Sequence, residues 1–221
     1  MTFQQEREDV CQVGKLLYDR GYVAANDGNI SVKAGADRLL ITPSGVSKGR
    51  MTPDMLLVTD LDGHVIEGDR HPSSEGKMHL EVYRRRPDVK AVVHAHPPVS
   101  TAFAVCRRGL ETHYLSELVA GLGRVPCTPS FAMLSTDEVP QSIRPYLADC
   151  NALLLANHGA LAWGGDLWEA FDRLETVEHT AKIVLNARLL GGGVPLTEEE
   201  VARLQQGLRG MYQTLREVRH G

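Results

Sequence analysis

Apolar positions along the chain change repeatedly between two spacings. Apolar residues three and four positions apart predict amphipathic helices, whereas short apolar runs bounded by glycine, proline and aspartate predict strands. The helical spacing covers residues 5–20, 73–85, 166–190 and 198–218, and a further helix is expected to begin near Val99. Strands are expected at residues 29–33, 38–42, 56–60, 89–96, 153–157 and 160–163.

The order of these elements predicts the fold class. His158-Gly159 joins two apolar runs and is typical of a tight antiparallel connection, and Thr197 with Glu200 forms a capping box for the last helix. Helices before, between and after hairpin-linked strands favour an α/β protein with layers on a largely antiparallel sheet. We expect a single domain over residues 1–221, because the sequence has no internal repeat, linker or low-complexity segment.

Composition and charge exclude several classes of protein. The formal net charge is -4, without the basic clusters typical of proteins that bind nucleic acid or membrane surfaces. No apolar run is long enough to span a bilayer, and the polar, acidic N-terminal residues do not resemble a signal peptide. The four cysteines have no C-x-x-C spacing, which favours reduced thiols. We therefore expect a cytoplasmic protein.

Two histidines stand one residue apart at the end of an apolar run, in Ala91-Val-Val-His-Ala-His-Pro-Pro98. Side chains two positions apart in a strand point to the same face, so His94 and His96 are expected side by side. The prolines cannot continue a hydrogen-bonded ladder, which places the pair at a strand end. By itself such a pair is as easily explained by two polar residues in contact with solvent.

His158 supplies a third imidazole. A single histidine in a turn usually makes a local hydrogen bond, and His158 alone would be a weak candidate for a metal ligand. Three histidines from two strand ends would leave zinc with an open coordination position, which is the catalytic pattern. Zinc also suits imidazole ligands better than magnesium or calcium does.

The segment Pro72-Ser-Ser-Glu75 precedes a predicted helix. Ser73 or Ser74 is expected as the N-cap, and the free N–H groups of a helix start favour an anion. Glu75 is then expected in the first turn, where the helix dipole alone would explain a carboxylate. A capped helix without any further role is the simpler interpretation.

Two glycine-containing turns carry small polar side chains, Asp27-Gly-Asn-Ile-Ser31 and Thr42-Pro-Ser-Gly45. Such turns let backbone N–H groups approach a phosphate closely. Neither turn is a Walker or Rossmann fingerprint, and each alone is more typical of an ordinary turn.

Taken together, these motifs are far more specific than any one of them. Their order and spacing resemble the class II aldolase/adducin family, and most closely its L-fuculose-1-phosphate aldolase branch, along essentially the whole chain. The motifs are Gly28-Asn-Ile-Ser31, Thr42-Pro-Ser-Gly45, Ser73-Ser-Glu75, His94-Ala-His96, His113-Tyr114 and Asn157-His-Gly159. The resemblance implies a three-layer α/β/α fold on a mainly antiparallel sheet, and a C4 homotetramer with active sites at subunit interfaces.

The resemblance also implies roles for individual residues. His94, His96 and His158 match the zinc ligands of the family, and Glu75 matches a catalytic glutamate that also binds zinc when substrate is absent. Tyr114 matches the tyrosine that handles the aldehyde oxygen. The residues that match the phosphate-binding turns are Gly28, Asn29, Ser44, Gly45, Ser73 and Ser74. Tyr212 is a looser match to a residue that reaches a neighbouring subunit's site.

The implied function is a zinc-dependent aldolase that reversibly cleaves a ketose 1-phosphate to dihydroxyacetone phosphate and an aldehyde. Candidate substrates are L-fuculose 1-phosphate and 5-deoxy- or 5-methylthio-ribulose 1-phosphate. The chain departs from the sugar aldolase at Asn26, where the family has threonine, and in the more basic loop of residues 46–50. These departures concern the identity of the sugar.

Other members of the family provide the alternatives. A methylthioribulose-1-phosphate dehydratase has an acidic residue near the position of Tyr114, and Glu117 keeps that option open. A ribulose-phosphate 4-epimerase has S-S-D in place of S-S-E, so Glu75 argues against it. A decarboxylase of sugar-acid phosphates is a further relative. A non-enzymatic adducin-like module would need neither the three histidines nor Glu75.

Overall fold

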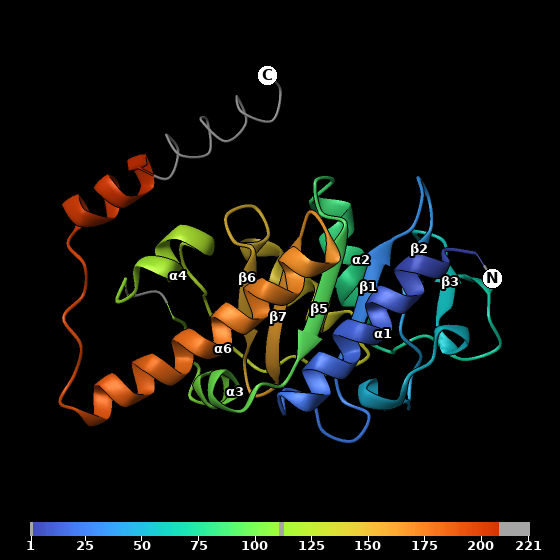
Figure 1. Ribbon diagram of the computed structural model, residues 1–221, viewed down its shortest axis with the longest axis horizontal. Coiled ribbons are helices and arrows are strands. Elements are labelled where there is room, and N and C mark those ends of the chain that lie inside the picture. Colours follow the sequence, from blue (N-terminus) through green and yellow to red (C-terminus); the bar gives the residue numbers. More distant parts are fainter. Residues whose placement is uncertain (1, 111–112, 208–221) are drawn as a thin grey trace.

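A seven-stranded sheet forms the centre of the computed structural model, which describes residues 2–110 and 113–207 (Figure 1). The strand order is β4-β3-β2-β1-β5-β7-β6, and every neighbouring pair is antiparallel. The strands are β1 (Asn29–Lys33), β2 (Leu39–Ile41), β3 (Leu57–Thr59), β4 (Val65–Glu67), β5 (Ala91–Ala95), β6 (Ala152–Leu155) and β7 (Gly159–Gly164).

Helices cover both faces of this sheet, which gives the three layers of an α/β/α fold (Figure 1). One face packs against α1 (Gln4–Asp19), α3 (Pro98–Val105) and the long α6 (Leu167–Leu189). The opposite face packs against α2 (Gly76–Arg85) and α5 (Glu138–Ile143). A short helix, α4 (Ser116–Gly121), lies against α6.

The alternation of side chains along β5 explains how one strand serves both layers. Ala91, Val93 and Ala95 face the cluster formed with α1, α3 and α6, whereas Val92 faces the cluster under α2. Successive side chains of a strand point to opposite faces, so His94 shares the face of Val92. The strand therefore places a buried histidine on the α2 side of the sheet, next to its C-terminal end.

Most elements expected from the hydrophobic pattern are present, and the predicted α/β/α fold class is confirmed. The strand β4 and the helices α4 and α5 were not expected, because they are too short to show a period. The capping box is confirmed, since Glu200 N donates to Thr197 Oγ1 and Thr197 N to Glu200 Oε2. The helix that follows is described over 198–207.

Residues 208–221, with Tyr212 among them, lie outside the described residues, and the expectation of one domain over residues 1–221 stays a prediction. Within residues 2–110 and 113–207, no helix is long and apolar enough to cross a membrane.

Leu161→Ala is expected to lower the free energy of unfolding by about 2–5 kcal/mol, the usual range for a buried leucine. Leu161 is fully buried in β7 and pairs with His94 across the sheet, so the cavity would open in the layer under α2. Urea denaturation followed by circular dichroism measures the change. Leu190→Ala is the control, because Leu190 is 88% exposed; equal effects of both changes would contradict this account of the core.

Candidate active site

Three histidines meet where β5 ends beside the β6–β7 connection. His94 lies in β5, His96 directly follows this strand, and His158 directly precedes β7. The pairing of Ala95 with Ala160 brings the two strand ends together. The possible ligand atoms of the three rings all lie within 4.8 Å of one another.

Two glycines allow the backbone to come this close. A Cβ atom at Gly159 would lie 2.5 Å from the His96 ring and 2.6 Å from the carbonyl oxygen of Ala95. Gly28 has a φ of +73°, and a Cβ atom there would lie 2.8 Å from the carbonyl oxygen of His94. Any side chain at either position would push the histidine-bearing segment away.

The His94 and His96 rings are oriented by groups outside the cluster. His94 Nδ1 donates to the carbonyl oxygen of Ala160 at 2.9 Å, because a carbonyl can only accept. His96 Nδ1 lies 3.5 Å from Asp27 Oδ2, which favours the proton on the same ring atom. With both protons directed outward, the two Nε2 atoms face each other at 3.1 Å. Contacts of this kind commonly orient metal-binding histidines.

Glu75 is the carboxylate of the cluster. Its Oε1 lies 3.1 Å from His158 Nε2, and its Oε2 lies 3.5 Å from His94 Nε2. Asn29 Nδ2 donates to Glu75 Oε2 at 2.7 Å, from the β1 position that pairs with His94. Strand β1 and the start of α2 thus hold the carboxylate over the imidazoles.

The expected cap of this helix is wrong. Helix α2 begins at Gly76, and its N-cap residue is Glu75, whose side chain makes no capping hydrogen bond. The Ser73 hydroxyl accepts from Glu75 N at 3.4 Å, one residue before the helix begins. The backbone explains the difference, because Ser73 N donates to the carbonyl oxygen of Thr42 and Ser44 N to that of His71. These bonds tie the segment before Glu75 to the turn at Thr42, so the helix starts later and Glu75 comes to the edge of the cluster.

Burial and neighbouring groups set the protonation states. Burial lowers the pKa of His94 to about 3, and burial together with the adjacent His158 lowers the pKa of His96. Burial alone would raise the pKa of Glu75, but the adjacent His94 and His158 and the Asn29 amide outweigh it and lower that pKa. At neutral pH the site therefore combines the neutral rings of His94 and His96 with the ionised carboxylate of Glu75.

This donor set fits a divalent metal ion. Two imidazole lone pairs that face each other at 3.1 Å repel unless a cation lies against them. Glu75 Oε1 is buried, and apart from the approach of His158 Nε2 to 3.1 Å it has no hydrogen-bond partner among the described residues, although buried acceptors are normally paired. Three nitrogen donors and one carboxylate match zinc in type and number, and leave a position for substrate when the carboxylate moves away.

A cavity of about 260 Å³ opens in front of the cluster. It brings together both glycine-containing turns, the segment before α2 and two of the histidines. The residues predicted from the motifs that line it are Gly28, Asn29, Ser44, Gly45, Ser73, Ser74, Glu75, His96 and His158. The motifs, far apart in the sequence, therefore share one cavity.

The cavity is also lined by residues that the motifs did not indicate, and Tyr114, a predicted site residue, does not line it. Leu134 and Ser135 line the cavity from an irregular loop whose sequence has no period that could have identified it, and Asp27 lies beside His96. Tyr114 does not line the cavity of its own chain. It packs at Gly193, where a Cβ atom would lie 2.9 Å from its ring.

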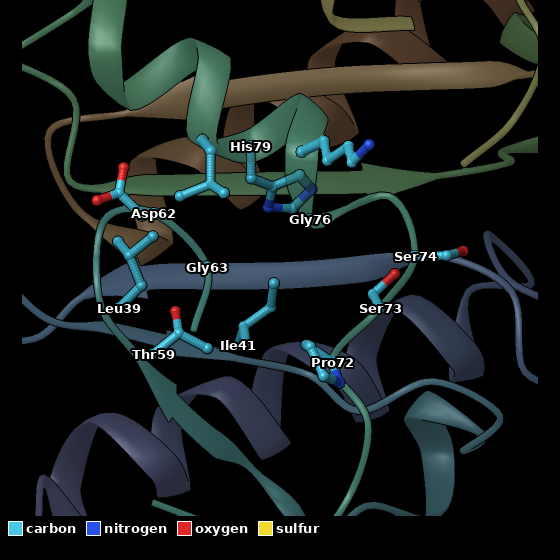
Figure 2. Close-up of a pocket in the computed structure, with 12 residues that line it drawn as sticks. Leu39, Ile41, Thr59, Asp62, Gly63, Pro72, Ser73, Ser74, Gly76 and His79 are labelled. Carbon is cyan, nitrogen blue, oxygen red and sulfur yellow. The ribbon is translucent and has the colours of Figure 1, made fainter. Parts of the chain in front are cut away.

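A second cavity, of about 270 Å³, lies beside α2 and is shown in Figure 2. It shares Ser73 and Ser74 with the first cavity, and its walls include Leu39, Ile41 and His79. Burial lowers the pKa of His79 to about 4, so the ring is neutral. None of the three clustered histidines lines this cavity, which places it outside the candidate metal centre.

Comparison with known proteins identifies the family. Residues 8–185 match the model of the class II aldolase and adducin N-terminal domain. The chain belongs to this family. As a class II aldolase-type chain it is an enzyme, a lyase, and the predicted resemblance is confirmed.

Relatives in this class II aldolase family differ in the reaction that their names state. The 5-deoxy-D-ribulose 1-phosphate aldolase of Bacillus thuringiensis is 35% identical over 215 residues, which cover 96% of this chain and 100% of the relative. The 3-oxo-tetronate 4-phosphate decarboxylase of Haemophilus influenzae is 34% identical, over 93% and 98% of the two chains. A solved structure of L-fuculose 1-phosphate aldolase is 31% identical, covers 95% and 98% of the chains, and has a TM-score of 0.87.

Proposed function

We propose that the protein is a zinc-dependent aldolase that reversibly cleaves a ketose 1-phosphate to dihydroxyacetone phosphate and an aldehyde. The proposal rests on the position of Glu75 against the three-histidine cluster. The two glycine-containing turns, which are expected to bind phosphate, line the same cavity as Glu75. The names of the aldolase relatives favour a small sugar such as 5-deoxyribulose 1-phosphate, with L-fuculose 1-phosphate as the next candidate.

His94, His96 and His158 would hold the metal ion, and Glu75 would be a fourth ligand until substrate arrives. When bound, the metal ion supplies Lewis-acid stabilisation of negative charge on the substrate oxygens. Glu75 would move the proton at the substrate carbon that becomes nucleophilic, because it is the ionised carboxylate that lies against the imidazoles. The hydrogen bond from Asn29 keeps Glu75 directed into the cavity.

The turns hold the far end of the substrate. Gly28, Asn29, Ser44, Gly45, Ser73 and Ser74 would bind the phosphate through backbone N–H groups and hydroxyls. Binding energy spent on this remote group fixes the reacting carbons against Glu75, which is how a non-reacting phosphate contributes to turnover.

Tyr114 is proposed to take the hydroxyl proton during cleavage and to return it during condensation. Because Tyr114 does not line the cavity of its own chain, we propose that it acts in the cavity of a neighbouring copy within a homotetramer. A role for Tyr212 at this interface and a cytoplasmic location stay predictions.

Tyr114→Phe is expected to slow turnover of the ketose phosphate by about 10²-fold or more, the usual scale for a lost acid–base group. The dissociation constant of inorganic phosphate should stay within about 2-fold, because the ring carries none of the phosphate-binding groups. Steady-state kinetics and calorimetry measure the two quantities. Tyr18→Phe, at an exposed position of α1, is the matched control.

Mixing two inactive variants tests the shared site. Tetramers assembled from Tyr114→Phe and Glu75→Gln chains contain some cavities with both native residues, so part of the activity should return. Failure of mixed tetramers to recover any activity would contradict the action of Tyr114 in a neighbouring copy.

A decarboxylase of a sugar-acid phosphate is the second candidate, because that relative is almost as similar to this chain, at 34% identity over 211 residues against 35% over 215. Both reactions pass through the enediolate of dihydroxyacetone phosphate, so proton exchange at this product does not separate them. They differ in the fragment that leaves, which is an aldehyde for the aldolase and carbon dioxide for the decarboxylase. We expect the zinc-loaded protein to release aldehyde from 5-deoxyribulose 1-phosphate. A protein that releases carbon dioxide from 3-oxo-tetronate 4-phosphate and no aldehyde from the ketose phosphate would be the decarboxylase.

A further inference from the structure

Lys48 is a buried cation that none of the proposed catalytic steps uses. It opens a short 3₁₀ turn, Lys48–Arg50, and is only 2% exposed, whereas every other lysine of the chain is at least partly exposed. Lysine is rarely buried without a specific partner, because removing its charge from water is costly. The partners of its Nζ atom therefore indicate what the residue does.

The ammonium joins the two turns that line the cavity. Nζ donates to the carbonyl oxygen of Val46 at 2.7 Å and to that of Asn26 at 3.1 Å. Asn26 comes directly before Asp27-Gly28, and Val46 comes directly after Ser44-Gly45. One side chain thus fixes the spacing between two segments that are far apart in the sequence. A lysine ammonium has three N–H groups, so one remains beyond these two bonds.

The charge of Lys48 complements the cavity. The described residues that line the cavity include the carboxylates Asp27 and Glu75 but no lysine or arginine. A substrate phosphate would bring further negative charge into this space. Burial lowers the pKa of Lys48 to about 8, while the nearby Asp27 and Glu75 act in the opposite direction. Lys48 therefore stays mostly protonated at neutral pH, and its charge acts on groups inside the cavity.

We propose that Lys48 is a positioning residue for the substrate phosphate, which ties the two phosphate turns together and supplies the fixed positive charge behind them. This inference rests on the proposed function and adds a source of selectivity to it. Lys48 makes the site prefer a phosphorylated ketone over the same ketone without phosphate. In a low-dielectric surrounding, a fixed charge near an anion acts strongly without direct contact.

The test uses Lys48→Met, which keeps the length of the side chain, and Lys48→Gln, which keeps an N–H donor without the charge. Zinc-loaded proteins are titrated with inorganic phosphate in a calorimeter. We expect both changes to raise the phosphate dissociation constant by about 10-fold, the scale of a lost charge-assisted interaction. Arg50→Met is the matched control, because Arg50 is an exposed cation of the same turn, and it should stay within about 2-fold of wild type.

A kinetic measurement separates this role from a general loss of structure. Proton exchange is compared between dihydroxyacetone phosphate and dihydroxyacetone, which lacks the phosphate. We expect the selectivity for the phosphorylated ketone to fall by about 10-fold in both Lys48 variants, mainly through a higher KM. A purely structural role would slow both ketones together and leave their ratio unchanged.

Each remaining outcome decides the inference. Wild-type phosphate affinity in Lys48→Gln would show that a hydrogen bond suffices and would overturn the role of the charge. If both variants fail to fold, wild-type protein labelled with ¹⁵N-lysine is titrated with phosphate, and the slowly exchanging ammonium of Lys48 should shift; an unmoved signal overturns the inference. If wild type binds phosphate but exchanges no dihydroxyacetone phosphate, the proposed function fails while the binding data still decide the role of Lys48.

Discussion

Glu75→Gln is expected to retain zinc and to lose proton exchange at dihydroxyacetone phosphate by about 10²-fold or more. Glutamine keeps the size of the side chain and the hydrogen bond from Asn29, but it cannot accept the carbon-bound proton. Three imidazoles remain for the metal ion, and solvent can complete its coordination shell. Metal analysis and NMR in heavy water measure the two quantities on the same sample.

The simpler role of Glu75 gives a different result. If Glu75 only stabilises the start of α2, its replacement by glutamine should lower the free energy of unfolding by about a few tenths of a kcal/mol. The rate of proton exchange should then stay at the wild-type value. Glu198→Gln is the matched control, because Glu198 is exposed at the start of the helix over 198–207 and lines no part of the cavity. Wild-type exchange in Glu75→Gln at saturating zinc would place the base elsewhere.

The second large effect is expected for His96→Ala, which should weaken zinc binding by more than about 100-fold. Removing a group that only hydrogen-bonds to a metal ligand already costs about 10–100-fold, and His96 would be a ligand itself. Exchange should fall to the rate of protein treated with a chelator. His96 is the best of the three positions to change, because its side chain is 27% exposed and its loss leaves a smaller cavity than loss of the fully buried His94.

A control separates ligand loss from the general effect of removing an imidazole. His64→Ala changes a side chain that is 80% exposed and lies outside the cluster, so zinc affinity and exchange should stay at wild-type values. Full exchange by His96→Ala without bound metal would show that the cluster is not the catalytic metal centre.

The local part of the site follows from the sequence by elementary geometry. His94 and His96 are neighbours because a strand repeats every two residues, and the two prolines that follow end the strand. The approach of His158 needs the pairing of β7 with β5, which a pattern of apolar residues does not specify. That long-range step came from the family resemblance of the motifs, not from periodicity.

The start of α2 shows why a local signal failed. Ser73 and Ser74 have the composition of a helix cap, but Ser73 N donates to the carbonyl oxygen of Thr42 and the helix begins only at Gly76. A tertiary hydrogen bond therefore overrode a local preference. The same reason applies to Lys48, whose burial depends on packing under α1, where a Cβ atom at Gly14 would lie 2.9 Å from the Lys48 carbonyl oxygen. No local pattern marks either contact.

The most direct test of the proposed reaction is identification of its products by mass spectrometry. Zinc-loaded protein is incubated with 5-deoxyribulose 1-phosphate, and a parallel sample is treated with a chelator before the substrate is added. The products of both samples are then analysed. An aldolase breaks the bond between C3, next to the ketone, and C4 of this substrate. We therefore expect dihydroxyacetone phosphate and acetaldehyde in equal amounts, and no products in the chelated sample. A product lighter by one water, or an isomer of unchanged mass, would contradict the aldolase and identify a dehydratase or an epimerase instead.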